Sequence, residues 1–241
     1  MRFFDTHIHL TDFKNTNLSE LILRLKSADI DKCVCVSSSP DDWEKVAKAA
    51  HDFAFDIIPA FGIHPWYIKQ THLNWQHDLE EYLKKFSDAP IGECGFDTLK
   101  NTDIKAQKEI FNIQLEFSKL YHRPLLLHAV KADEILQNYQ AVLPENTIFH
   151  SFSGSLERAR QLTKFGFYFA INTRFFQKKE ANRILQTIAP DRLLIETDAP
   201  YQSAPEDLPY LIQRIAEVLQ KDIQETSEMI YLNAERLFLS D

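Results

Sequence analysis

Two histidines near the N-terminus are the first residues of this sequence that could do chemistry. His7 and His9 end an apolar run that begins at Phe3. Side chains of a strand alternate between its faces, so both imidazoles point the same way and could form half of a metal site. An isolated His-x-His also occurs in ordinary strands. The metal interpretation therefore needs further ligands at the ends of other strands.

Four later apolar runs each end in a residue that can bind a metal ion. These residues are Glu93, His128, His150 and Asp198. Each has an ordinary alternative: Glu93 could face solvent, His128 could be a hydrogen-bonded core histidine, and Asp198 could start a turn. Four histidines and two acids do not easily gather on one rim by chance. The whole set predicts a metal centre.

The number of candidate ligands predicts two ions rather than one. A catalytic zinc takes about three protein ligands and a water. The surplus suggests a second ion and a carboxylate that bridges the pair. Paired ions stabilise the attacking and leaving oxygens of a displacement and lower the pKa of a bound water. The ligand types suit two divalent cations, with Mg, Mn or Zn as candidates.

The elements that must position these residues alternate between apolar runs and amphipathic stretches. Strands are expected at residues 2–7, 32–37, 57–61, 89–94, 124–127, 147–149, 167–171 and 192–196. Helices are expected near residues 18–25, 76–86, 104–121, 131–140, 156–165, 178–188, 208–219 and 223–237, and one that starts at 39–42 with Pro40 in its first turn. About eight strands, each followed by a helix, predict an α/β fold, a (β/α)₈ TIM-type barrel with an extra C-terminal helix. Residues 1–241 are expected to form one domain.

The composition argues against several classes of protein. No run of about 18 apolar residues is present, so no membrane-spanning helix is expected. Three cysteines, Cys33, Cys35 and Cys94, are too few for a disulfide framework and favour the cytoplasm. The formal net charge of −8 argues against tight nonspecific binding to a polyanion, although a metal centre could supply local positive charge.

Taken together, the motifs resemble those of the TatD-type metal-dependent deoxyribonucleases, a branch of the amidohydrolase-like barrels. The resemblance runs nearly from end to end. It rests on Phe4-Asp5-Thr6-His7-Ile8-His9, Gly62-Ile63-His64-Pro65, Gly92-Glu93-Cys94-Gly95-Phe96-Asp97, Gln107, Phe111, Gln114, Pro124-Leu125-Leu126-Leu127-His128, His150-Ser151-Phe152-Ser153-Gly154, Glu196-Thr197-Asp198-Ala199-Pro200-Tyr201 and the stretch 233–238.

The resemblance implies a role for each candidate ligand. The implied metal ligands are His7, His9, Glu93, His128, His150 and Asp198. The first ion would take the two N-terminal histidines and Asp198, the second would take the other two histidines, and Glu93 would bridge. Asp198 would also accept a proton from the attacking water, so Asp198 and Glu93 are the expected catalytic residues. Asp5 is expected to orient a ligand histidine.

One position departs from the family pattern. The family usually carries an Arg two residues after the histidine of the fifth strand, and Val130 stands there. Lys131 could partly substitute, but its ammonium cannot make the bidentate contact of a guanidinium. His64 and Lys131 are the expected substrate-binding residues. Lys100 and Arg174 are further candidates, for which a solvated surface charge is the simpler interpretation.

The leading functional hypothesis is a metal-dependent hydrolase of DNA, a 3′–5′ exonuclease on single-stranded ends. The substrate would bind transiently and weakly, and the protein would be a monomer without membrane contact. The alternative is a small-molecule amide, ester or phosphate hydrolase with the same metals, because a fold does not fix its substrate. Val130 and the acidic charge favour that alternative somewhat. A non-catalytic binding protein is a third hypothesis, which the complete ligand set argues against.

Overall fold

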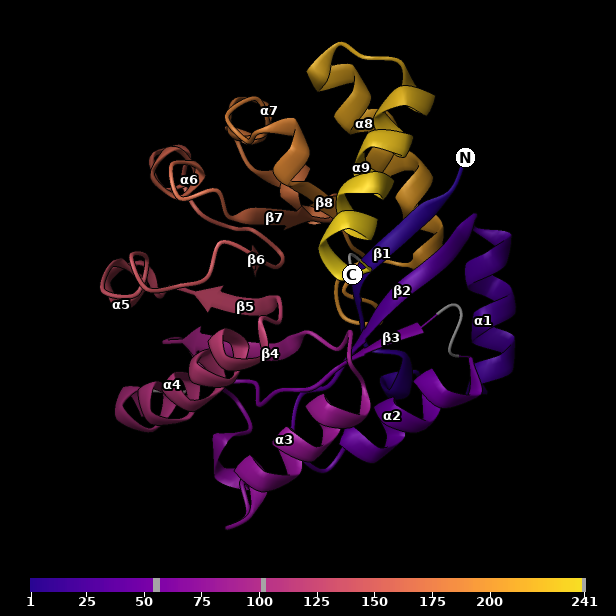
Figure 1. Cartoon of the computed structure of the whole chain (residues 1–241). Helices are drawn as coiled ribbons and strands as arrows, with labels where there is room; N and C mark the ends of the chain where they lie inside the picture. Colours follow the sequence, from indigo (N-terminus) through magenta and orange to yellow (C-terminus); the bar gives the residue numbers. More distant parts are fainter. Residues whose placement is uncertain (54–56, 101–102, 240–241) are drawn as a thin grey trace.

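Parallel strands form a ring at the centre of the computed structural model, and helices surround them (Figure 1). The structure describes residues 1–53, 57–100 and 103–239. The strands are β1 (Phe3–Ile8), β2 (Ile30–Val36), β3 (Ile57–Ala60), β4 (Ile91–Asp97), β5 (Leu125–Val130), β6 (Thr147–Phe149), β7 (Tyr168–Ile171) and β8 (Leu193–Ile195). They pair in sequence order as two parallel runs, β1 to β3 and β4 to β8.

Two seams join these runs into a barrel. At the first seam the Gly92 N–H donates to the carbonyl of Phe61 at 3.0 Å, beside an isolated parallel bridge between Phe61 and Ile91. At the second seam the Asp198 N–H donates to the carbonyl of His7 at 2.8 Å. This bond lies beyond the end of β8, so the residues that follow the last strand complete the ring. The predicted TIM-type barrel is confirmed.

The helices cover the outside of the ring. They are α1 (Leu18–Ser27), α2 (Trp43–Asp52), α3 (Trp75–Lys85), α4 (Ile104–Tyr121), α5 (Asp133–Gln137), α6 (Leu156–Thr163), α7 (Ala181–Leu185), α8 (Leu208–Leu219) and α9 (Ile223–Phe238). Several begin at a side chain that accepts from a backbone N–H of the first turn: Asn17 before α1, Asp103 before α4 and Ser155 before α6. Among the described residues, no helix is long and apolar enough to cross a membrane.

Alternation along the strands separates two apolar cores. The interior of the barrel is filled by Phe4, Val34, Val36, Ile58, Ala60, Leu126, Ile148, Tyr168, Ala170 and Leu194. Cys33 and Cys35, the neighbours of these residues in β2, pack in the outer core with the helices. The extra C-terminal helix, α9, adds Tyr231, Ala234 and Phe238 to the interior cluster. Because α9 packs against β1 and β8 near their start, the opposite, C-terminal end of the barrel is left for the polar residues.

Two strands run further than expected. β4 ends at Asp97 and β5 at Val130, because their ladder continues through the pairs Gly95 with His128 and Asp97 with Val130. Glu93 therefore lies inside β4 rather than at its end. A φ of 51° at Lys131 turns the chain out of β5.

Three helices also differ from expectation. Helices α5 and α7 each have five residues, and a 3₁₀ helix at Thr173–Gln177 precedes α7. Helix α2 starts at Trp43, and Pro40 lies in a turn before it rather than in its first turn. The side chain of Asp42 accepts from the N–H groups of Ser38 and Ser39 at 2.8 and 3.3 Å, which holds this turn together.

Candidate metal centre

The six residues expected to bind metal come together at the C-terminal end of the barrel. Two lie on or beside β1, one on β4, one on β5, one directly after β6 and one after β8: His7, His9, Glu93, His128, His150 and Asp198. None of them is more than 9% exposed. Carboxylates and imidazoles from strands far apart in the sequence thus lie together in one buried cluster.

His7, His9 and Asp198 form a first group of ligand atoms. The two Nε2 atoms are 3.3 Å apart, and Asp198 Oδ1 is 3.4 Å from that of His9 and 3.9 Å from that of His7. Glu93 Oε2 faces the same atoms at 3.5 Å from His7 and 3.6 Å from His9. Two imidazole nitrogens and two carboxylate oxygens converging in this way suit a divalent cation.

The second group gathers around the other oxygen of Glu93. Glu93 Oε1 is 2.7 Å from His128 Nδ1 and 2.9 Å from His150 Nε2, and these nitrogens are 3.4 Å apart. His64 Nε2 lies 3.5 Å from the same oxygen. The two oxygens of Glu93 therefore face different groups of imidazoles, and such a carboxylate could serve two ions.

The electrostatics of the cluster agree with cation binding. Burial would raise the pKa of Glu93, but the charge of His150 and hydrogen bonds from His128 and His150 hold it well below its usual range. Burial lowers the pKa of His7, and the nearby His150 lowers it further. An ionised acid among crowded imidazoles, some of them neutral, is a donor set that divalent cations fit.

His64 differs from the other histidines in its hydrogen bonds. Its Nδ1 accepts from the Trp66 N–H at 3.1 Å, so its proton is on Nε2, which faces Glu93. Burial lowers the pKa of His64 to about 3, so the ring stays neutral near pH 7. His64 can therefore act as a neutral hydrogen-bond donor inside the cavity.

Asp5 holds backbone rather than an imidazole ring, which corrects the expectation that it orients a ligand histidine. Its Oδ1 accepts from the N–H groups of His7 at 3.2 Å and Thr197 at 3.0 Å, and its Oδ2 accepts from the Thr197 hydroxyl at 2.6 Å. Asp5 thereby fixes β1 against the segment that carries Asp198. Burial raises the pKa of Asp5 to about 7 against these hydrogen bonds.

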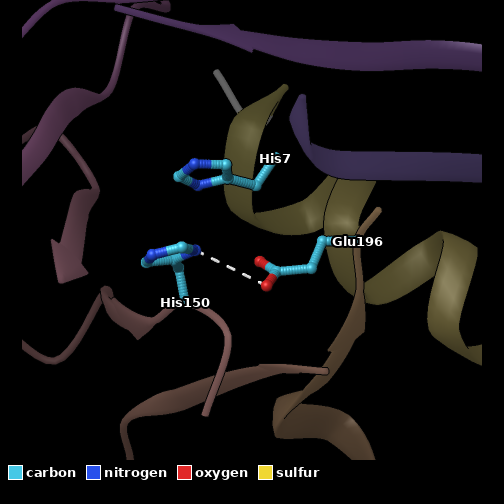
Figure 2. A group of neighbouring side chains, drawn as sticks. All are labelled: His7, His150 and Glu196. Carbon is cyan, nitrogen blue, oxygen red and sulfur yellow. Dashed lines mark ion pairs between the residues drawn. The ribbon is translucent and has the colours of Figure 1, made fainter. Parts of the chain in front are cut away.

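Glu196 is a site residue that the sequence analysis quoted in a motif but did not assign. Figure 2 shows the imidazoles of His7 and His150 lying against each other, with the Glu196 carboxylate beside His150. Glu196 Oε1 lies 3.5 Å from His150 Nδ1 and accepts from the Ser151 N–H at 2.6 Å. The carboxylate can orient the His150 ring so that Nε2 faces Glu93. The sequence offered one signal for this residue: Glu196 stands two residues before Asp198, the spacing at which side chains of an extended segment share a face.

Asp97 and Gln202 were also not predicted. Asp97 Oδ2 lies 3.5 Å from His128 Nε2, on the side of that ring away from Glu93, and accepts from the Trp66 indole N–H at 2.6 Å. Burial opposes ionisation of Asp97, but the hydrogen bonds it accepts hold its pKa below its usual range. The Gln202 amide donates to Asp198 Oδ2. Each of these contacts fixes the orientation of a candidate ligand.

A cavity of about 440 Å³ opens over the two groups. Trp66 and Tyr201, 40% and 60% exposed, line it together with Lys100 and Arg174. Lys100 and Arg174 thus face the site, although a solvated surface charge was the simpler interpretation. Lys131, expected to bind substrate here, instead lines a neighbouring cavity beside α6 because its φ turns it away from the end of β5.

Fold and site together define the chain as a TIM-type barrel with a group of potential metal ligands at the C-terminal ends of its strands. A family model described as TatD related DNase matches residues 4–239, and the chain belongs to this family.

Relatives of the whole chain carry related names. The chain is 29% identical to a metal-dependent hydrolase, YabD, of Bacillus subtilis over 98% of both chains. It is 26% identical to the 3′-5′ ssDNA/RNA exonuclease TatD of Cronobacter turicensis, over 99% of this chain and 98% of that one. The crystal structure of YjjV, a TatD homologue from Escherichia coli, has the same fold, with a TM-score of 0.89, 23% identity and coverage of 100% of this chain and 99% of that one.

Proposed function

We propose that this chain is a metal-dependent deoxyribonuclease that removes nucleotides from the 3′ ends of single-stranded DNA. The single observation that carries the proposal is the position of Glu93, whose two oxygens face two separate groups of imidazoles. The relative named as a 3′-5′ ssDNA/RNA exonuclease and the deoxyribonuclease Tat-D of Schizosaccharomyces pombe, 25% identical over 83% of this chain and 73% of that one, support the choice of substrate.

Six residues would hold two divalent cations. We assign His7, His9 and Asp198 to the first ion, and the histidines at 128 and 150 to the second, with Glu93 shared, because the distances divide the atoms in this way. Paired ions supply Lewis acidity and lower the pKa of a bound water toward about 7. The six residues belong to one barrel and need no partner subunit to complete the set, so we take residues 1–241 to act as one domain in a monomer.

Asp198 is placed to accept a proton during hydrolysis. Burial would raise its pKa, but its hydrogen bond with His9 and the charges of His7 and His150 lower it, so the carboxylate is ionised near neutral pH. Gln202 holds Oδ2, while Oδ1 faces His9 at 3.4 Å. An oriented, ionised carboxylate at the floor of the cavity is the arrangement that general-base catalysis requires.

The walls of the cavity suit a nucleic-acid strand. Trp66 and Tyr201 present partly exposed rings, on which bases stack with about 1–3 kcal/mol each. Lys100 lies with its Nζ 3.3 Å from the centre of the Trp66 ring, and Arg174 also lines the cavity. Rings with cations beside them match alternating bases and phosphates better than they match a small amide.

Cleavage of single-stranded DNA labelled at its 3′ end tests the proposal. We expect loss of the label before internal fragments appear, and loss of activity in excess chelator. Tyr201→Ala should raise the KM for the strand about tenfold by removing a stacking surface, and Tyr201→Phe should restore most of it. Tyr210→Ala, at a 56% exposed tyrosine of α8, is the matched control. Turnover of small esters or amides without DNA cleavage would instead support a small-molecule hydrolase.

The compartment is part of the same proposal. Cys33, Cys35 and Cys94 are buried free thiols, which persist most easily in a reducing environment. We therefore place the enzyme in the cytoplasm. Fractionation of the source cells tests this placement.

A further inference from the structure

A second cavity lies beside the metal centre and is enriched in positive charge. Its volume is about 550 Å³, and it lies between α5, α6 and the segment that leads into α7. We call it the α6 cavity, and the lining residues that matter here are Val130, Lys131, His150, Arg158, Lys178 and Lys179. Val130 and His150 also line the cavity over the metal ligands, so the two spaces adjoin.

Arg158 carries a buried guanidinium with one nitrogen that lacks a partner. It is only 4% exposed and lines the α6 cavity from helix α6. Its Nε lies 3.3 Å from Asp133 Oδ1, and its Nη1 donates to Gln140 Oε1 at 3.3 Å. Its Nη2 has no hydrogen-bond partner among the described residues. Guanidinium groups stay charged in proteins, and a buried charged donor without a partner is costly, so an acceptor at Nη2 would be strongly favoured.

Other cations surround this guanidinium. Lys178 donates to the carbonyls of Ser153 and Gly154, which themselves line the cavity, and burial lowers its pKa. Lys131 and Lys179 lie at the cavity wall. Helix α6 begins directly after Ser155, and the positive end of its dipole adds a partial positive charge to the cavity.

The acids of the cavity do not cancel this charge. Asp133 faces Arg158, and Glu180 is engaged by Arg183 outside the lining. The lining therefore holds four cationic side chains and two acids in a chain whose net charge is −8. A local positive excess in an acidic protein, focused by apolar walls, selects for an anion.

We propose that the α6 cavity is a phosphate-binding site, in which Arg158 contributes the free Nη2 of its guanidinium and the lysines contribute charge. The inference rests on the proposed nuclease function for its natural source, a neighbouring phosphate of the strand whose end lies at the metal centre. A guanidinium N–H makes a strong, charge-assisted hydrogen bond with a phosphate oxygen. The same chemistry would also accept free inorganic phosphate.

Direct binding tests the site independently of catalysis. Inorganic phosphate is titrated calorimetrically into the full-length protein after chelator treatment, so that phosphate cannot bind to metal ions. We expect measurable binding that Arg158→Gln weakens about tenfold or more, as expected for loss of a charge-assisted hydrogen bond. Arg160→Gln, at an exposed arginine of the same helix, is the matched control and should bind as the unmodified protein does.

A second variant keeps the test decisive if Arg158→Gln fails to fold, which thermal unfolding would show. Lys131→Glu reverses an exposed charge of the lining and should weaken phosphate binding at least severalfold. Absence of phosphate binding by the unmodified protein, or binding unchanged in both variants, would overturn the proposal.

Kinetics separate the two sources of phosphate. For the metal-loaded enzyme we compare the KM of a single-stranded pentanucleotide with that of bis(p-nitrophenyl) phosphate, which has no second phosphate. A rise of about tenfold in this ratio in Arg158→Gln assigns the site to the strand. An unchanged ratio with weakened phosphate binding assigns it to the free anion. If the enzyme cleaves no DNA but Arg158→Gln still weakens phosphate binding, the nuclease proposal fails and the phosphate site stands.

Discussion

The backbone N–H of Asp198 donates a 2.8 Å hydrogen bond to the carbonyl of His7. This bond joins the first strand to the segment after the last one. The contact that closes the barrel therefore also brings Asp198 beside His7 and His9. Asp198 has a φ of 52°, in the left-handed region that costs a non-glycine residue about 1 kcal/mol or more. The closed ring holds this conformation, and Asp5 supports it by accepting from the adjacent Thr197 N–H at 3.0 Å.

The shared position of Glu93 predicts how metal content responds to substitution. Glu93→Gln should weaken both ions, because each carboxylate oxygen faces one group. His128→Ala should weaken the second ion more than the first, because its Nδ1 lies 2.7 Å from Glu93 Oε1, the oxygen of the second group. Elemental analysis and metal titration measure both effects. Unchanged affinities in Glu93→Gln would show that the carboxylate does not bridge.

Asp198→Asn should lower kcat at least about 10²-fold, the low end for loss of a general base. An amide can still accept the hydrogen bond of Gln202, so the fold should be retained, but it cannot accept a proton from water. Steady-state kinetics on single-stranded DNA at fixed metal concentration measure the effect. Asp78→Asn, at a partly exposed acid of α3 outside the cavity, is the control that should keep full activity. Equal rates for both variants would exclude Asp198 as the base.

Asp5 predicts a pH dependence of stability in chelator-treated protein. Its pKa is raised from 3.8 to about 7 in the folded state, so the folded protein holds this proton more tightly than the unfolded chain does. The stability it contributes is complete below about pH 3.8 and is lost as the pH rises through about 7. Asn does not titrate, so Asp5→Asn should keep its stability over this range. The Tm of the variant minus that of the unmodified protein should therefore increase between pH 5.5 and 8. A relative Tm that is constant or falls would contradict this pKa.

Glu196→Gln tests whether this carboxylate orients His150 or binds metal itself. His7, His150 and Glu196 offer ligand atoms within 4.8 Å of one another, so both roles are open to it. The amide of Gln can still accept from the Ser151 N–H, but it lacks the charge that raises the pKa of His150. We expect metal affinity at the second group to fall about 10- to 100-fold with the stoichiometry retained. Loss of a whole equivalent of metal would make Glu196 a ligand.

The sequence by itself determined the architecture and the six candidate ligands that the structure brings together. Apolar runs of strand length, separated by amphipathic stretches, can bury both of their faces only in a parallel sheet covered by helices. Alternation along β2 places Cys33 and Cys35 in the outer core and Val34 and Val36 in the interior of the barrel. Each candidate ligand could be found because it is a polar residue in or directly after an apolar run.

Only the tertiary structure decided which atoms meet. The distance of each Glu93 oxygen from each imidazole depends on strand register and on closure of the ring, and neither leaves a local pattern in the sequence. For the same reason Asp5 was expected at an imidazole but holds the backbone of His7 and Thr197. Lys131 was expected to bind substrate beside the metal ligands, but it lines the α6 cavity, as does Arg158 from a separate helix. Contacts between segments far apart in the chain depend on how the elements pack, and no local pattern in the sequence reveals that packing.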